Sequence, residues 1–394
     1  MTGDSNPAVK PDLFARPASR LLRLAASASA LASLVACASG VTPTEPGIAT
    51  GAATDAAATA PDGLGYYLQS VRGHFDLMAR ARPISDWLAD PETSAALRQR
   101  LQLAQQIREF AVKELSLPDN ASYRRYADLG RPAAVWNVVA APELSLKLKT
   151  WCFPVMGCVG YRGYFARGDA DAQAQQLRAE GLEAIVYGVP AYSTLGWSNW
   201  LGGDPLLNTF VNGSESALAR LIFHELAHQV AYARDDTRFN ESYATAVERL
   251  GLTRWHAVTG RPDDEAVAAQ QRAADFKAMT RRTRAALQAL YASDQSVAVQ
   301  RQRKAALMVG LQAEYAGLKA SPGGPWAGYT GYDRWFANAS NAALALLTAY
   351  DGWVPEFERL FALQGQDFAR FHAEVRRLAA LPGAERAAAL QAVP

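Results

Sequence analysis

The chain has 394 residues, of which 49% are apolar and 20% are charged, and its net charge is +2. These proportions are typical of a soluble globular protein with a sizeable core, and the length allows one large domain or two ordinary ones. Because 40 basic side chains stand against 38 acidic ones, no basic excess is available to neutralise phosphates. Nucleic acid is therefore not an expected partner.

Residues 1–36 are expected to form a secretion signal, with basic residues ahead of an apolar run at 24–36. The run is shorter than the roughly 20 residues that span a bilayer. It ends in Leu34-Val35-Ala36-Cys37, which resembles the lipobox of bacterial lipoproteins. The resemblance implies that Cys37 is acylated and anchors the protein to a bacterial membrane facing the periplasm, with the outer membrane favoured over the inner. The alternative is an ordinary signal peptide with a chance cysteine nearby.

Residues 37–62 are Ala, Thr, Gly and Pro with hardly a large apolar side chain. Such a segment cannot bury enough surface to fold, so it is predicted to be a flexible tether. From Gly63 to the end the composition is that of a globular protein, and no internal repeat or second linker interrupts it. The prediction is one catalytic domain over residues 63–394.

The predicted elements make the fold α+β and mostly helical. Apolar side chains at helical spacing predict helices around 67–78 and 93–115, the second ending before Pro118. Runs at 134–140 and 183–188 are β-rich, with a helical stretch at 169–181 between them. Everything after Ser214 is predicted to be helical, with breaks at Pro262, at 322–325 and at Pro355. The regularly spaced aromatic residues of this part are predicted to pack in the core: Trp335, Phe336, Phe357, Phe361, Phe368 and Phe371.

Cys152 and Cys158 are the remaining cysteines once Cys37 is assigned to the anchor. Pro154 and Gly157 between them let the chain turn back on itself. In an oxidising compartment a disulfide is the favoured prediction. A metal site is the rival, but it would need two further ligands and no histidine lies near in sequence.

The strongest functional signal is His224-Glu225-Leu226-Ala227-His228. Ser214 can cap a helix through this segment, and Leu218, Leu221 and Ile222 give it a buried side. Two histidines four residues apart lie on one helix face and can bind one metal ion, whereas Glu225 lies about 100° further round the helix, beside a metal-bound water. The bland alternative is a pair of helical histidines satisfied by hydrogen bonds.

A catalytic zinc needs a third protein ligand and an open position for water. No histidine follows His228 before His256, so the third ligand is predicted to be acidic. The candidates are Asp235, Asp236, Glu241 and Glu248. Asn240 is a plausible cap of the helix that carries Glu241, and Glu248 lies two turns further along the same face.

The motif followed by Asn240-Glu-Ser-Tyr-Ala244 resembles the gluzincin metallopeptidases, especially the aminopeptidase N-like enzymes. In that group the Glu of the Asn-Glu pair is the third zinc ligand, which implies Glu241 here. The spacing from His228 is several residues shorter than in those enzymes. The first helix must therefore end near Ala233 if Glu241 is to reach the metal, and Glu248 becomes the better candidate if it runs longer.

A broader resemblance covers nearly the whole domain. Its strings include Leu117-Pro-Asp-Asn-Ala-Ser-Tyr123, Val135-Trp-Asn-Val-Val-Ala-Ala-Pro-Glu143, Ala191-Tyr-Ser-Thr-Leu-Gly-Trp197 and Gly331-Tyr-Asp-Arg-Trp335. They resemble a bacterial lipoprotein family of predicted zinc-dependent aminopeptidases. The resemblance implies a zincin-like domain, with a small mixed sheet packed on the active-site helix, that holds one Zn²⁺ per chain and hydrolyses peptides.

Aminopeptidase action would need an acidic group for the substrate's free ammonium. The Gly-x-Met-Glu-Asn string that supplies it in aminopeptidase N-like enzymes is missing from this sequence. Glu143 and Asp204 are weak candidates for that role.

The predicted mechanism is attack of a zinc-bound water on the peptide carbonyl, with Glu225 as general base. Tyr332, Tyr192 and His256 are candidates for stabilising the oxyanion, although each is more often a packing residue. The segment 185–197 could pair with an extended substrate or be a core strand and turn. The alternative function is a periplasmic binding or envelope-assembly lipoprotein with a structural zinc, which would show four protein ligands and no use for Glu225.

Overall fold

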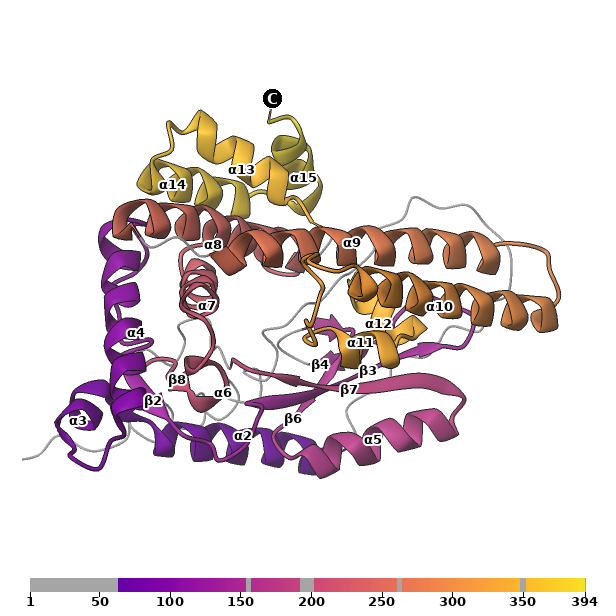
Figure 1. Cartoon of the computed structure of the whole chain (residues 1–394), viewed down its shortest axis with the longest axis horizontal. Helices are drawn as coiled ribbons and strands as arrows, with labels where there is room; N and C mark the ends of the chain where they lie inside the picture. The colour runs from indigo at the N-terminus through magenta and orange to yellow at the C-terminus, as the bar shows by residue number, and fades with distance from the viewer. Residues whose placement is uncertain (1–62, 154–156, 192–201, 261–263, 348–351, 394) are drawn as a thin grey trace, which may run out of the picture.

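The computed structural model describes residues 63–153, 157–191, 202–260, 264–347 and 352–393. Elements carry the labels of Figure 1. The helices are α2 (Gly63–Arg80), α3 (Ile84–Ala89), α4 (Ala95–Lys113), α5 (Arg167–Ala179), α6 (Asn208–Val211), α7 (Glu215–His228), α8 (Thr237–Thr259), α9 (Asp264–Tyr291), α10 (Val297–Ala320), α11 (Asp333–Ala337), α12 (Asn341–Leu346), α13 (Val354–Leu363), α14 (Phe368–Ala379) and α15 (Gly383–Gln391). The strands are β1 (Arg82–Pro83), β2 (Arg125–Ala127), β3 (Val135–Pro142), β4 (Trp151–Phe153), β5 (Gly157–Val159), β6 (Arg162–Tyr164), β7 (Leu182–Val189) and β8 (Leu206–Leu207).

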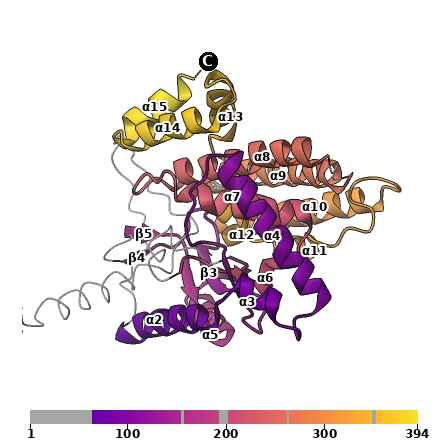
Figure 2. The ribbon, with the colours of Figure 1, turned by 90° about the vertical axis from the view of Figure 1, so that its left-hand side faces the viewer.

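The described chain is α+β and mostly helical, and its helices surround α7 (Figure 1). Helix α7 packs against α8 and α4, and α13 packs on α8 from the other side. Both views place α13 to α15 at one end of the molecule and α2 with α5 at the other (Figures 1 and 2). Helix α7 thus lies inside the molecule, where packing holds its side chains in place.

Three small sheets accompany the helices in the described part of the chain. The β-rich runs at 134–140 and 183–188 form β3 and β7, which pair antiparallel from Val135 opposite Val189 to Pro142 opposite Leu182. Strand β6 pairs antiparallel with the other edge of β3. This sheet packs against α5 and α12, so it is not the small mixed sheet expected on the active-site helix.

A mixed sheet does adjoin α7, but other strands build it. Strand β2 pairs antiparallel with β1 and parallel with β8. Its Tyr126 and the Leu206 of β8 lie in the same core cluster as Leu218 and Ile222 of α7. Strands of two or three residues carry too weak a period-2 pattern to be recognised in the sequence.

Close approach of α7 and α8 depends on a glycine. A Cβ on Gly251 of α8 would lie 2.8 Å from the Phe223 ring of α7 and 2.8 Å from Leu115. A side chain there would require the Phe223 ring and Leu115 to move. The packing across this interface is therefore fixed closely enough to hold facing polar groups in register.

The other helical predictions agree with the structure to within a few residues at each end. Helices α2, α4, α5 and α7 occupy the predicted segments, and Ser214 caps α7 by accepting a hydrogen bond from the backbone N–H of Ala217 at 3.1 Å. Phe336, Phe357, Phe361, Phe368 and Phe371 are buried, and Trp335 packs against one of the core clusters.

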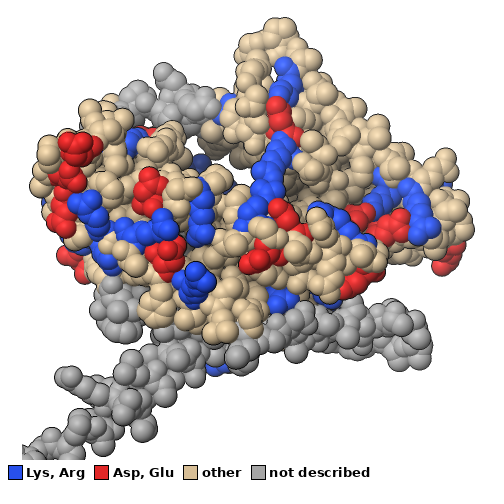
Figure 3. All heavy atoms as spheres, turned by 90° about the horizontal axis from the view of Figure 1, so that it is seen from below, with Lys and Arg blue, Asp and Glu red and all other residues tan. Residues whose placement is uncertain are grey.

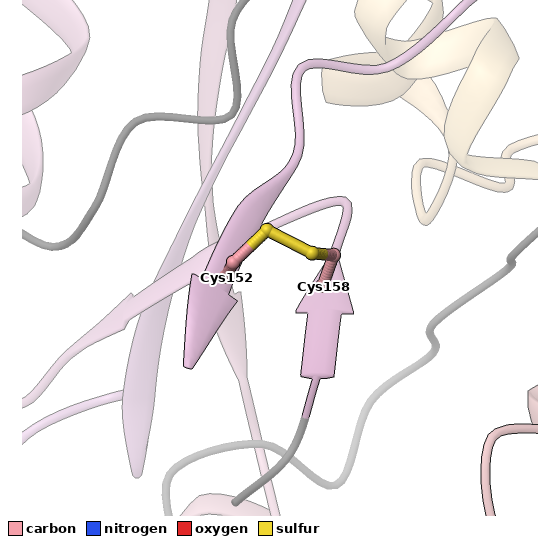
Figure 4. Close-up of a disulfide and its surroundings, with 2 residues drawn as sticks. All are labelled: Cys152 and Cys158. Atoms are coloured by element: carbon pink, nitrogen blue, oxygen red, sulfur yellow. A yellow bond between two sulfur atoms is a disulfide. The ribbon is translucent and has the colours of Figure 1, made fainter. Parts of the chain in front are cut away.

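A disulfide joins Cys152 of β4 to Cys158 of β5, directly opposite each other in the antiparallel pair (Figure 4). Cys37, the predicted signal at 1–36, the tether at 37–62 and Pro262 lie outside the described residues. None of the described helices is both long and apolar enough to cross a bilayer. On the face seen from below, acidic and basic side chains are interspersed (Figure 3).

Candidate metal centre

Helix α7 has two different sides. Leu218, Ile222 and Leu226 are fully buried in the core that α7 shares with α4 and α8. His224 and His228 lie on another face, with 18% and 6% of their side chains exposed. The apolar side therefore anchors the helix, and this anchoring fixes the direction in which the two imidazoles point.

The chain turns sharply after His228. Helix α7 ends at His228 rather than near Ala233, and Asp235 in the connecting turn has a φ of 60°. Asp236 caps α8 by accepting a hydrogen bond from the N–H of Phe239 at 3.0 Å. Because the first helix stops so early, the short connection still brings α8 back beside the two histidines.

Asn240 is not the cap that the sequence predicts, since it lies inside α8. Its buried side chain accepts a hydrogen bond from the backbone N–H of Ala233 and donates one to the carbonyl of the same residue, both at 2.8 Å. The amide therefore satisfies both backbone groups of Ala233 in the turn. This double hydrogen bond ties the first turns of α8 to the connecting turn, at the residue directly before Glu241.

Three side-chain atoms converge between the two helices. The Nε2 atoms of His224 and His228 are 3.2 Å apart. The carboxylate of Glu241 lies 3.4 Å from the Nε2 of His224 and 3.6 Å from that of His228. Metal–ligand bonds of about 2.0–2.2 Å in tetrahedral geometry would place ligand atoms roughly 3.4 Å from one another. His224, His228 and Glu241 therefore form a group that could hold a metal ion.

Glu248 contacts the same histidine from behind. One of its carboxylate oxygens lies 3.0 Å from the Nδ1 of His224, and the other accepts a hydrogen bond from Arg220 at 3.1 Å. Nδ1 is the nitrogen that faces away from the converging Nε2 atoms. Glu248 therefore supports His224, whereas Glu241 lies on the side where the three ligand atoms meet.

The two remaining acidic candidates lie elsewhere. The side chain of Asp235 is 61% exposed and lies beside Arg234. Asp236 caps α8 with one oxygen and forms an ion pair with the buried Arg386 at 2.5 Å with the other. Of the four carboxylates considered, only Glu241 belongs to the converging group.

The buried charges shift one another's pKa values. Burial by itself lowers the pKa of His224, but the carboxylates of Glu241 and Glu248 outweigh it and raise that pKa well above its ordinary value. Burial opposes ionisation of Glu248, yet hydrogen bonds to His224 and Arg220 hold its pKa below the usual range. Burial lowers the pKa of His228 to about 4, with only partial compensation by Glu241. The two carboxylates therefore place negative charge beside His224, which a bound cation would offset.

Glu225 follows His224 on α7 and is half-buried. Its side chain leaves the helix about 100° round from that of His224. It does not belong to the group of converging atoms, and this angle is the one expected of a base beside a metal-bound water.

Of the candidates for oxyanion stabilisation, His256 is wrong. It lies 15 residues beyond Glu241 on α8, about 22 Å along the helix, and its Nε2 is 3.1 Å from the Oγ of Ser216 near the start of α7. Tyr192 lies outside the described residues. Tyr332 stacks on Phe276. Burial raises the pKa of Tyr332, and the positive charge of the nearby Arg220 offsets part of this rise.

The two candidates for ammonium binding differ in their surroundings. Glu143 forms a bidentate ion pair with Arg301 of α10, and this pair holds the pKa of the Glu143 carboxyl below its usual range. Asp204 is fully buried, and its backbone carbonyl accepts a hydrogen bond from Tyr123. Neither of them belongs to the converging group.

The structure adds a contact that the sequence did not suggest. Gln229, which directly follows His228, accepts a hydrogen bond from Asn120 at 2.6 Å and donates one to Ser122 at 3.2 Å. The buried Arg108 in turn holds this loop by donating to the carbonyls of Ser122 and Pro118. Pro118, Asn120 and Ser122 belong to the string at 117–123. That string therefore holds the C-terminal end of α7 in place.

Comparison with known proteins gives one family. A family model described as "Putative aminopeptidase" matches residues 65–390. No curated protein matches the chain. No solved structure matches it either.

Proposed function

The chain belongs to the putative aminopeptidase family, and from this premise we propose that it is a zinc-dependent peptidase with a zincin-like centre on α7 and α8. The family supports a peptidase function. The zinc dependence and the mechanism are our proposal, and they rest on the residues described above.

One observation carries the proposal: the Nε2 atoms of His224 and His228 and the Glu241 carboxylate lie 3.2–3.6 Å from one another. Two imidazoles and one carboxylate are a ligand set that zinc uses in catalytic sites, where the fourth position stays open. A structural zinc would call for four protein ligands, but the group found among the described residues has three. This difference favours an enzyme over a binding protein with a structural zinc.

In the proposed mechanism His224, His228 and Glu241 hold the ion. Zinc bound there would lower the pKa of a water molecule and polarise the scissile carbonyl. Glu225 would accept a proton from the attacking water and pass it to the leaving amine. Glu225 suits this role because it flanks the ligands without belonging to them.

Strand β7 is our candidate for holding the substrate. It forms one edge of the sheet in the order β6-β3-β7, and a sheet edge can add an extended peptide through backbone hydrogen bonds. Pro190 directly follows β7, and its carbonyl accepts a hydrogen bond at 2.5 Å from the hydroxyl of Thr209 in α6. Helix α6 directly follows β8. The described part of the predicted segment 185–197 is thus connected to the chain that leads into α7.

We also propose that Cys37 carries the lipid anchor, which would place the centre on the periplasmic side of a bacterial membrane. This part of the proposal rests on the Leu34-Val35-Ala36-Cys37 string alone. Labelling growing cells with a palmitate analogue tests it: the parent chain should be labelled and a Cys37→Ala chain should not.

The function is tested by cleavage assays on paired peptides, one with a free amino terminus and one N-acetylated. We expect Glu225→Gln to keep one zinc per chain while losing about 10²- to 10⁴-fold in rate, the usual contribution of a general base. Glu109→Gln, which changes an exposed carboxylate on α4, is the matched control and should cleave like the parent. Cleavage of the free-amine peptides alone would establish aminopeptidase action, and undiminished cleavage by Glu225→Gln would overturn the mechanism.

A further inference from the structure

Arg220 lies one helical turn before His224 on the same face of α7. Helices α7 and α8 run antiparallel in this region, so that face meets two carboxylates of α8 in order. We call this row the ladder and define it by its members: Arg220, Glu248, His224, Glu241 and His228. Arg220 forms the end of the ladder furthest from the proposed metal.

Glu248 divides its two oxygens between neighbours on α7. One oxygen accepts a hydrogen bond from Arg220 at 3.1 Å and the other lies 3.0 Å from the Nδ1 of His224. An ionised carboxylate can only accept hydrogen bonds, so the Nδ1 of His224 must carry the proton. In the neutral ring that a metal ion requires, the lone pair is then on Nε2, the atom that faces Glu241 and His228.

His228 has no comparable support. Its Nδ1 is buried and has no hydrogen-bond partner in the described part of the chain. Of the two imidazoles, only His224 therefore has its tautomer and ring orientation set by a carboxylate. The preorganisation of the centre depends on how firmly Glu248 is held.

We propose that Arg220 is a positioning residue for the zinc centre. By fixing one oxygen of Glu248 it aims the other at the Nδ1 of His224, which keeps Nε2 ready for the metal. Arg220 acts through Glu248, which it contacts at 3.1 Å, and does not itself belong to the group of converging ligand atoms. This inference rests on the proposed zinc site and extends it to a residue that the His-Glu-x-x-His pattern does not include.

The competing explanation is an ordinary surface ion pair. The Arg220 side chain is 40% exposed, and exposed ion pairs usually contribute little to stability. Such a pair would leave zinc affinity unchanged when broken. Zinc affinity, and not activity or melting temperature, therefore separates the two explanations.

The test measures zinc dissociation constants of the full chain by competition with a chelator. Glu248→Gln should weaken zinc binding by about 10- to 100-fold, the usual cost of losing the partner behind a ligand. Arg220→Ala should weaken it less, by up to about tenfold on the same scale, and Arg220→Lys should restore part of the loss. The double variant should bind no more weakly than Glu248→Gln alone, because Arg220 acts only through that carboxylate.

Arg249→Ala is the matched control, since it removes a cation beside Glu248 in sequence that pairs with Glu358 at 3.6 Å on the surface. It should bind zinc like the parent chain. Parent-like affinity in Arg220→Ala, or additive losses in the double variant, would overturn the role of Arg220 while leaving the zinc centre intact. Failure of the parent chain to bind one zinc would overturn the proposed function and this inference together.

Discussion

His372 of α14 and the pair His224 and His228 of α7 pack against different faces of α8, and their ring nitrogens are satisfied in different ways. His372 of α14 is 1% exposed and lies 2.8 Å from the hydroxyl of Tyr243 and 2.8 Å from the carbonyl of Leu115. Both of its nitrogens are therefore paired with protein oxygens. Tyr243 follows Glu241 by two residues and points to the opposite face of the same helix.

The histidines of the ladder show the contrasting pattern. The Nε2 atoms of His224 and His228 face each other at 3.2 Å, with a carboxylate next to both. Two nitrogens and an anion that converge on one point are satisfied best by a cation placed among them. The two sets thus differ in where their nitrogens point: those of His372 end on protein oxygens, whereas the Nε2 atoms of His224 and His228 converge with a carboxylate.

Removing a ladder histidine should break the metal centre and spare the fold. We expect His228→Ala to lose more zinc affinity than the roughly 10- to 100-fold that a partner behind a ligand provides, and peptide cleavage should fall with it. The metal-free variant should melt close to the metal-free parent. Chelator competition and thermal unfolding without metal measure both effects; a variant that keeps zinc at parent affinity would show that His228 is not a ligand.

The opposite result is expected at His372. His372→Ala would leave the buried oxygens of Tyr243 and Leu115 unpaired and open a cavity, at a cost of about 2–4 kcal/mol in the free energy of unfolding. Zinc affinity should stay within a few-fold of the parent in the folded protein. Urea unfolding with parallel zinc titration is the measurement. A stability unchanged by the substitution would mean that this network does not hold α14 on α8.

The pH dependence of the free energy of unfolding should differ between the parent chain and a His372→Gln variant. Burial is the main reason why the pKa of His372 falls from 6.5 to about 4. The folded state therefore favours the neutral ring: the stabilisation is complete above pH 6.5 and is lost as the pH falls towards 4, by about 3 kcal/mol in total. Unfolding of metal-free parent and His372→Gln at several pH values should show a flatter curve for the variant. Parallel curves would contradict the shifted pKa of His372.

The smallest effect on peptide cleavage is expected at Glu143, whose carboxylate contacts Arg301 and neither set of histidines. Its carboxylate is exposed and already paired with Arg301. Glu143→Gln should leave the ratio of free-amine to N-acetylated peptide cleavage unchanged. A variant that loses the preference for a free amino terminus would instead make Glu143 the ammonium site.

Part of this comparison could be predicted from the sequence. The spacing of His224 and His228 on a capped helix is a local property, because four residues make about one turn. The choice between Glu241 and Glu248 is not local, because it depends on where α7 ends and how α8 packs against it. The amide of Asn240 on the turn and the absence of a side chain at Gly251 decide that packing, and neither effect is visible in a pattern of apolar residues.

Arg220 illustrates the same limit. It lies four residues before His224, so the sequence places it on the face of α7 that carries His224 and His228. Its importance appears only when α8 brings Glu248 between the two. The strands next to α7 were missed for a different reason: β1 and β8 are two residues long and β2 three, and pairing over distant parts of the chain defines them.

The most direct test of the central claim is an anomalous diffraction map at the zinc edge, from crystals of the chain grown with zinc. The account predicts one strong peak per chain, about 2.0–2.2 Å from the Nε2 of His224, the Nε2 of His228 and the carboxylate of Glu241, with no fourth protein ligand. Glu248 should remain on the Nδ1 of His224. A peak bound by Glu248, a fourth protein ligand, or no peak between α7 and α8 would contradict the account.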